Sequence, residues 1–129
     1  MKTVEELQLP SDRKYTKEHV WIKMEGDTAL VGISDYAQDQ LGEVAFVDVP
    51  ELHHMDAHAE FGSVESVKSV NALYMPVAGE ILASNTELES TPTLINVSCY
   101  SEGWIIKIKP DDPSAIDALL DAQQYQSGL

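Results

Sequence analysis

One lysine stands out as a candidate for chemistry. Lys68 is one of eight basic residues in the chain and lies in the segment Glu65-Ser66-Val67-Lys68-Ser69-Val70. The residues around it are mostly small or apolar and include several valines, which predicts two strands joined by a tight turn. The amine of Lys68 would then project from the tip of a hairpin, where a modifying enzyme could reach it in one fixed geometry. The alternative is an ordinary surface lysine that faces Glu65.

The histidines and the cysteine are weaker candidates for chemistry. His53, His54 and His58 lie in a polar segment with no cysteine nearby and no predicted helix to align them, so a solvated turn is favoured over a zinc site. Cys99 is the only cysteine, which excludes an internal disulfide and fits a reducing compartment. No pairing of a nucleophile with a base is evident, which argues against an enzyme with its own active site.

The composition limits the possible partners and locations. A chain of 129 residues predicts one domain with its own core. Its 22 acidic and 8 basic residues give a net charge of −14, which repels nucleic acid and anionic lipid and favours basic protein surfaces. No apolar run approaches the ~20 residues that cross a bilayer, and the first residues lack the layout of a signal peptide. We therefore expect a cytoplasmic monomer, since nothing indicates an oligomer interface.

Short strands dominate the predicted secondary structure. We expect a hairpin over residues 20–24 and 28–33, the lysine hairpin at about 61–75, and further strands over 43–49, 80–83, 94–97 and 104–109. Many closely spaced strands predict an antiparallel sandwich or flattened barrel with helices as accessories.

Two helices are expected outside these strands. Ser34 is a suitable N-cap for a short helix over residues 35–41, and Gly42 supplies its C-terminal stop. One face of this helix would carry Tyr36, Ala37, Gln40 and Leu41. Ser114 and Asp117 could form a capping box for a C-terminal helix at about 114–125.

Taken together, these segments resemble the glycine cleavage system H proteins, a family of lipoyl carrier proteins. The motifs that carry the resemblance, in the order of the family, are Tyr15-Thr16 with His19 and Trp21, Val31-Gly32-Ile33-Ser34-Asp35-Tyr36-Ala37-Gln38, Leu41-Gly42-Glu43, Phe46-Val47-Asp48-Val49-Pro50-Glu51, Gly62 to Val70, Leu73-Tyr74, Pro76-Val77-Ala78-Gly79-Glu80, and Gly103-Trp104 with Lys107-Ile108-Lys109. They span nearly the whole chain, and the Glu-Ser-Val-Lys core together with Ser-Asp-Tyr-Ala-Gln is the most specific part.

The resemblance implies a fold and a modification. The fold would be mainly β, a barrel-sandwich hybrid of the lipoyl/biotinyl type, with residues 1–129 forming a single lipoyl-carrier domain. Lys68 would carry lipoate in amide linkage. Glu65, Ser66, Val67 and Ser69 would form the recognition surface for the attaching enzyme, a lipoate ligase or a lipoyl or octanoyl transferase.

The resemblance also implies partners. In the family, a pyridoxal-phosphate glycine decarboxylase loads an aminomethyl group onto the arm and a tetrahydrofolate-dependent aminomethyltransferase unloads it. A dihydrolipoyl dehydrogenase then reoxidises the arm. The carrier would therefore be a non-catalytic component of glycine catabolism and one-carbon metabolism.

The chain departs from the family pattern at three places. Val20 replaces a Glu that usually lies between the His and the Trp, and Val20 can join the core instead. The segments 52–60 and 98–101 also differ from the usual loops. These changes leave open a lipoyl relay for other complexes, or an unmodified interaction module of the same fold. A biotin carrier is less consistent, because that family usually has methionines where Val67 and Ser69 flank the lysine.

Overall fold

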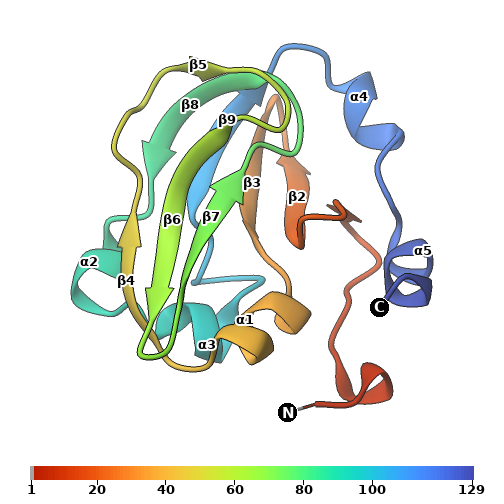
Figure 1. Cartoon of the computed structure of the whole chain (residues 1–129). Helices are drawn as coiled ribbons and strands as arrows, with labels where there is room; N and C mark the ends of the chain where they lie inside the picture. Colours follow the sequence, from red (N-terminus) through yellow and green to blue (C-terminus); the bar gives the residue numbers. More distant parts are fainter. Residues whose placement is uncertain (1) are drawn as a thin grey trace.

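Two antiparallel β-sheets face each other across an apolar core in the computed structural model, which describes residues 2–129 (Figure 1). The larger sheet contains, in spatial order, β1 (Lys14–Tyr15), β2 (Val20–Glu25), β3 (Thr28–Ile33), β9 (Ile106–Pro110), β8 (Gly79–Ser84) and β5 (His54–Met55). The smaller sheet contains β4 (Val44–Asp48), β6 (Glu60–Ser66) and β7 (Val70–Tyr74). The mainly β fold that the sequence predicts is confirmed, with two sheets that do not close into a barrel.

Buried and exposed side chains alternate along the strands, and the buried ones form the core. Ile106 and Ile108 of β9 are fully buried, whereas Lys109 between Ile108 and Pro110 is exposed. They pack with side chains of the smaller sheet such as Phe61 and Val64. Val20 is buried among the same residues, as the sequence predicts. Burial of this kind contributes roughly 1.5–3 kcal/mol for each large aliphatic or aromatic side chain.

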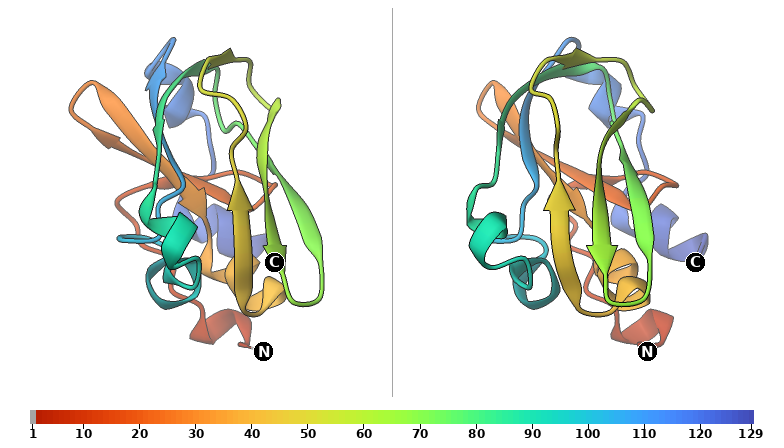
Figure 2. Two further views of the ribbon diagram at one scale, coloured as in Figure 1. Left: turned by 90° about the vertical axis from the view of Figure 1, so that its left-hand side faces the viewer. Right: turned by 60° about the vertical axis from the view of Figure 1, so that its left-hand side comes forward.

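One helix lies beside the tip of the lysine hairpin. Helix α1 (Asp35–Leu41) begins at Ser34, whose side-chain oxygen accepts a hydrogen bond from the Ala37 amide at 3.2 Å. It ends at Gly42, whose φ of 77° is a left-handed conformation that glycine adopts without strain. Figures 1 and 2 show the turn between β6 and β7 close to α1. Both predicted ends of this helix are confirmed.

The prediction of a strand over residues 94–97 is wrong, because this segment is helix α3 (Leu94–Ser98). It follows the short helix α2 (Glu87–Ser90). In a strand, Ile95 and Val97 would point to the same side. Here Ile95 is fully buried and Val97 is 81% exposed, because the Asn96 and Val97 amides both donate to the Thr93 carbonyl in a helical turn.

The continuous helix expected over 114–125 is two short helices, α4 (Ser114–Asp117) and α5 (Ala122–Ser127). Leu120 between them pairs with Tyr15 through two backbone hydrogen bonds of 2.8 and 3.0 Å, which keeps the chain extended at that point. The predicted capping box of Ser114 and Asp117 is also wrong. Pro113 precedes α4, and the capping box forms at Asp121 and Gln124 of α5 instead.

The remaining elements lie at the periphery. A short 3-10 helix, η1 (Val4–Glu6), precedes β1. The divergent segment 52–60 contains β5, which pairs with β8 at the edge of the larger sheet. Within residues 2–129 there is no helix with the length and apolar character needed to span a bilayer.

Candidate functional site

The turn that carries Lys68 is fixed by one buried serine. Strands β6 and β7 pair up to Glu65 opposite Val70, and the Ser66 amide donates to the Ser69 carbonyl at 2.8 Å. The Ser66 side-chain oxygen accepts hydrogen bonds from the amides of Lys68, at 3.2 Å, and Ser69, at 3.1 Å. The Val67 amide donates to the Glu43 carbonyl at 3.3 Å, which ties the tip to the segment after α1. The predicted hairpin is therefore present, and hydrogen bonds from within the turn and from the segment after α1 brace its tip.

The side chain of Lys68 is exposed and crosses the C-terminal end of α1. A Cβ atom added to Gly42 would lie 3.4 Å from Cε and 3.8 Å from Nζ of Lys68. Within residues 2–129 the lysine forms no ion pair, with Glu65 or with any other acid. The amine is thus neither buried nor neutralised by a neighbouring side chain.

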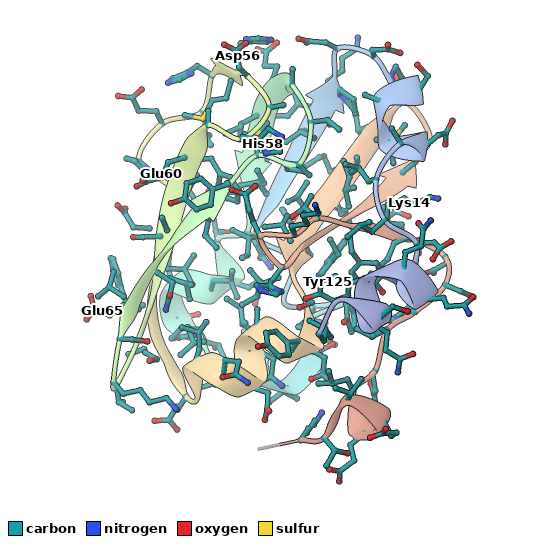
Figure 3. The ribbon with its side chains drawn as sticks, turned by 45° about the vertical axis from the view of Figure 1, so that its right-hand side comes forward. Lys14, Asp56, His58, Glu60, Glu65 and Tyr125 are labelled. Atoms are coloured by element: carbon teal, nitrogen blue, oxygen red, sulfur yellow. The ribbon has the colours of Figure 1, made fainter. Side chains whose placement is uncertain are left out.

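The four predicted neighbours of Lys68 have different environments. Glu65 is exposed on the outer side of the hairpin, where Figure 3 shows it pointing away from the body of the molecule. Val67 is 75% exposed, an unusual position for a valine. Ser69 is exposed as well, whereas Ser66 is only 5% exposed because its side chain lies inside the turn. Three of the four can therefore touch a partner directly.

A cleft of about 430 Å³ begins next to the hairpin tip. One wall is the predicted face of α1, and all four of its residues, Tyr36, Ala37, Gln40 and Leu41, line the cleft. The opposite wall is formed by Ser69 and by β7, and the far end by Glu18 and His19. The cleft joins residues that are distant in the sequence, so only its α1 face was predictable.

Comparison with known proteins decides the family. Residues 13–129 match the family model described as glycine cleavage H-protein. A glycine cleavage system H protein of Bacteroides thetaiotaomicron is 50% identical over 122 residues, which are 94% of this chain and 97% of the relative. One from Thermus thermophilus is 51% identical over 124 residues, 95% of this chain and 97% of the relative.

The chain belongs to the glycine cleavage H-protein family. The crystal structure of a glycine cleavage system H protein from Mycobacterium marinum has the same fold. Its TM-score is 0.83 at 35% sequence identity, and the match covers 94% of this chain and all of that one. The resemblance carried by the hairpin motifs is therefore confirmed.

The divergent histidine segment of this H-protein chain pairs with acids. His54 contacts Asp111 at 2.6 Å, His58 contacts Glu18 at 3.1 Å, and His53 contacts Glu51. The hydrogen bond with Asp111 raises the pKa of His54 above its usual value. In the part of the chain that is described, no three His, Cys, Asp or Glu residues converge as metal ligands would.

The second divergent segment, 98–101, is anchored to the rest of the molecule. The Cys99 carbonyl accepts a hydrogen bond from the Trp21 indole at 3.0 Å, and the Tyr100 carbonyl accepts one from Arg13 at 2.9 Å. Burial raises the pKa of the Cys99 thiol to about 12, so the thiol remains protonated and unreactive near neutral pH.

A buried carboxylate fastens the N-terminal segment to the helix of the site. Asp35, the first residue of α1, accepts hydrogen bonds from Lys2 Nζ at 2.9 Å, the Gln8 amide at 2.9 Å and Gln38 Nε2 at 2.7 Å. Burial alone would raise the pKa of Asp35, but these hydrogen bonds outweigh it and lower the pKa below the usual value. Asp35 therefore stabilises the fold in its ionised form.

Replacing Asp35 with asparagine should lower the free energy of unfolding by about 1–3 kcal/mol at neutral pH, because three donors lose a charged acceptor. A carboxylate with a lowered folded pKa contributes stability above its unfolded pKa of about 3.9 and loses that contribution as the pH falls through the folded value. Wild type should therefore lose more stability than Asp35→Asn between about pH 5 and pH 3, measured by urea denaturation. Asp39→Asn is the control, because among the described residues, 2–129, Asp39 accepts only the Lys2 backbone amide, at 2.9 Å. Parallel pH profiles for wild type and Asp35→Asn would contradict this assignment.

Proposed function

We propose that this chain is the lipoyl carrier of a glycine cleavage system, with lipoate in amide linkage to Lys68. The observation that carries the proposal is the exposed Lys68 amine, held on a hydrogen-bonded turn at the mouth of a cleft in a member of this family. A rigid support presents the amine to the attaching enzyme in the same way each time. Acylation then converts a solvated cation into a neutral, flexible arm.

The residues of the site fit such a group. The cleft begins at Ser69, the residue after the lysine, so an arm on Lys68 can fold back into it without rearrangement of the turn. Its walls include the aliphatic side chains of Leu41, Val64 and Leu73, which suit an alkyl chain, together with polar groups at the end near His19. When bound, the lipoyl group supplies a dithiolane ring that accepts a group on one sulfur as the ring is reduced.

The neighbours of Lys68 divide into two roles in this proposal. Glu65, Val67 and Ser69 are exposed and form the surface that the attaching enzyme contacts. Ser66 acts indirectly, because its buried hydroxyl shapes the turn from which the lysine projects. A lipoate ligase or a lipoyl or octanoyl transferase would provide the complementary surface.

The carrier itself has no catalytic role in this proposal. It would move an aminomethyl group from a pyridoxal-phosphate glycine decarboxylase to a tetrahydrofolate-dependent aminomethyltransferase, after which a dihydrolipoyl dehydrogenase would restore the ring. The net charge of −14 supports brief docking to basic surfaces on these enzymes. We propose that the chain works as one domain and as a monomer in the cytoplasm, where a lone buried cysteine meets reducing conditions.

Intact mass spectrometry of the protein from its native host, with peptide mapping, tests the proposal. The expected result is one lipoyl adduct, located on Lys68. A biotinyl adduct would replace the proposal with a biotin carrier. An unmodified lysine in cells that contain an active glycine cleavage system would instead indicate an interaction module.

A further inference from the structure

One tyrosine hydroxyl joins two segments that line the cleft. Tyr125 lies on α5, and its side chain is only 2% exposed and faces the body of the molecule (Figure 3). Its hydroxyl oxygen is 2.7 Å from Nδ1 of His19 and 2.7 Å from Oγ of Ser34. His19 lines the cleft, and Ser34 is the N-cap of the helix that forms one wall. Through a single atom, the C-terminal helix therefore contacts the N-cap of the helix that forms one wall and the histidine at the far end of the cleft.

The donors and acceptors favour one direction for these hydrogen bonds. Ser34 is fully buried, and its oxygen already accepts from the Ala37 amide, so its own hydrogen needs an acceptor. Within residues 2–129 the other partner of that oxygen is the Tyr125 hydroxyl. Ser34 then donates to Tyr125, and Tyr125 donates to Nδ1 of His19. The neutral imidazole consequently carries its proton on Nε2.

Neutral imidazole is consistent with the surroundings of His19. Partial burial lowers the pKa of His19 below its usual value, so the ring is uncharged near neutral pH. The ring also packs on Tyr36 of α1, with the two ring centroids 4.7 Å apart. Its backbone has a φ of 68°, a left-handed conformation that is unusual for a residue with a side chain. The ring orientation thus depends on neighbours that hold the residue in this conformation.

The ring of Tyr125 is itself held by stacking. It lies nearly parallel to Tyr15, with the ring centroids 4.9 Å apart and an interplanar angle of 8°. Removing the hydroxyl alone would leave this stacking in place. The contribution of the hydroxyl to the cleft can therefore be separated from the packing of the ring.

We propose that Tyr125 is a positioning residue for the cleft of this carrier. Its hydroxyl ties the turn before β2 to the N-cap of α1 and holds His19 as the Nε2-protonated tautomer at the end of the cleft. The far end of the cleft then presents the Nε2–H donor of His19 to the arm on Lys68. This last step depends on the proposed function, whereas the tautomer of His19 does not.

The first test uses the unmodified protein. We compare wild type, Tyr125→Phe and Tyr15→Phe by NMR of the ¹⁵N-labelled imidazoles near neutral pH. Tyr15→Phe is the matched control, because it also removes a buried tyrosine hydroxyl, the one that donates to the Pro10 carbonyl at 2.7 Å. We expect one His19 tautomer with the proton on Nε2 in wild type and in Tyr15→Phe, and a mixture of tautomers in Tyr125→Phe. A proton on Nδ1 in wild type, or the same spectrum in Tyr125→Phe, would overturn the proposal.

The second test uses the lipoylated protein loaded with an aminomethyl group. Water breaks the sulfur–carbon bond of the loaded arm to give the free thiol, formaldehyde and ammonium, with no change in oxidation state. Loss of one hydrogen bond at the cleft should speed formaldehyde release about fivefold in Tyr125→Phe and leave Tyr15→Phe near wild type. Equal rates in all three proteins would show that the hydroxyl does not shape the cleft. Absence of lipoate from Lys68 would instead refute the carrier function, and the tautomer result would stand.

Discussion

Replacing Lys68 with alanine should abolish carrier activity and leave the fold unchanged. The side chain is exposed, and the part of Lys68 that holds the turn is its backbone amide, which alanine retains. The free energy of unfolding should therefore change by no more than about 0.5 kcal/mol, the usual range for exposed positions. Mass spectrometry should show no lipoyl adduct, and glycine cleavage reconstituted with the partner enzymes should fall to the level without carrier.

Two variants serve as controls for this result. Lys68→Arg keeps the positive charge but cannot be acylated in the same way, so it should be as inactive as the alanine variant. Lys109→Ala removes an exposed lysine from β9, a strand of the larger sheet that is not part of the lysine hairpin, and should keep full activity. A marked loss of stability in Lys68→Ala would show that the lysine supports the fold, and activity in Lys68→Arg would contradict attachment at this amine.

Replacing Trp21 with alanine should have the largest effect on stability. The indole is fully buried, its N–H donates to the Cys99 carbonyl at 3.0 Å, and the Arg13 guanidinium lies 4.7 Å from the ring centroid. Gly32 on the neighbouring strand makes room for it, because a Cβ atom there would lie 2.8 Å from the ring. Truncation of a buried tryptophan of this kind costs about 3–5 kcal/mol, a large part of the total stability of a small domain.

Urea denaturation of three variants separates the causes of this loss. Trp21→Phe retains much of the apolar volume but leaves the Cys99 carbonyl without its donor, so it should cost about 1–3 kcal/mol. Trp104→Ala changes a tryptophan that is only partly buried and should cost less than Trp21→Ala. If Trp21→Ala lost less than about 1 kcal/mol, the aromatic cluster around Trp21 would be too loosely packed to support this interpretation.

Local signals in the sequence were sufficient for the hairpin and for α1. The Lys68 turn follows from β-branched residues on both sides of small polar ones, and α1 follows from Ser34 and Gly42 at its two ends. Each of these features depends on residues that are close in the sequence. The lysine was singled out for the same reason, because its exposure requires only that it lie in a turn.

The errors occurred where distant contacts decide the local structure. Val97 favours a strand by propensity, but Asn96 of α3 donates to the Gly42 carbonyl at 2.7 Å and accepts from the Val44 amide at 2.9 Å, which fixes the segment against α1. The C-terminal helix is interrupted because Leu120 pairs with Tyr15. No pattern within either segment reveals these partners.

The cleft was missed for a similar reason. His19, Ser34 and Tyr125 come from three separate parts of the chain, and their contacts depend on the final packing of α5. His19 belongs to the motif of Tyr15-Thr16 with His19 and Trp21, but nothing in the sequence indicated what its ring contacts, and Tyr125 was only the last residue of the expected C-terminal helix. The motifs that identify the family include His19 and Ser34, but they do not indicate what these side chains contact, and they do not include Tyr125.

The hydroxyl bridge from α5 also sets an order of events during translation. A ribosome makes His19, Ser34 and Lys68 well before it makes Tyr125. The contacts that close the end of the cleft must wait until the final helix has emerged. A nascent chain that has not yet reached Tyr125 therefore contains Lys68 but lacks the hydroxyl that contacts His19 and Ser34.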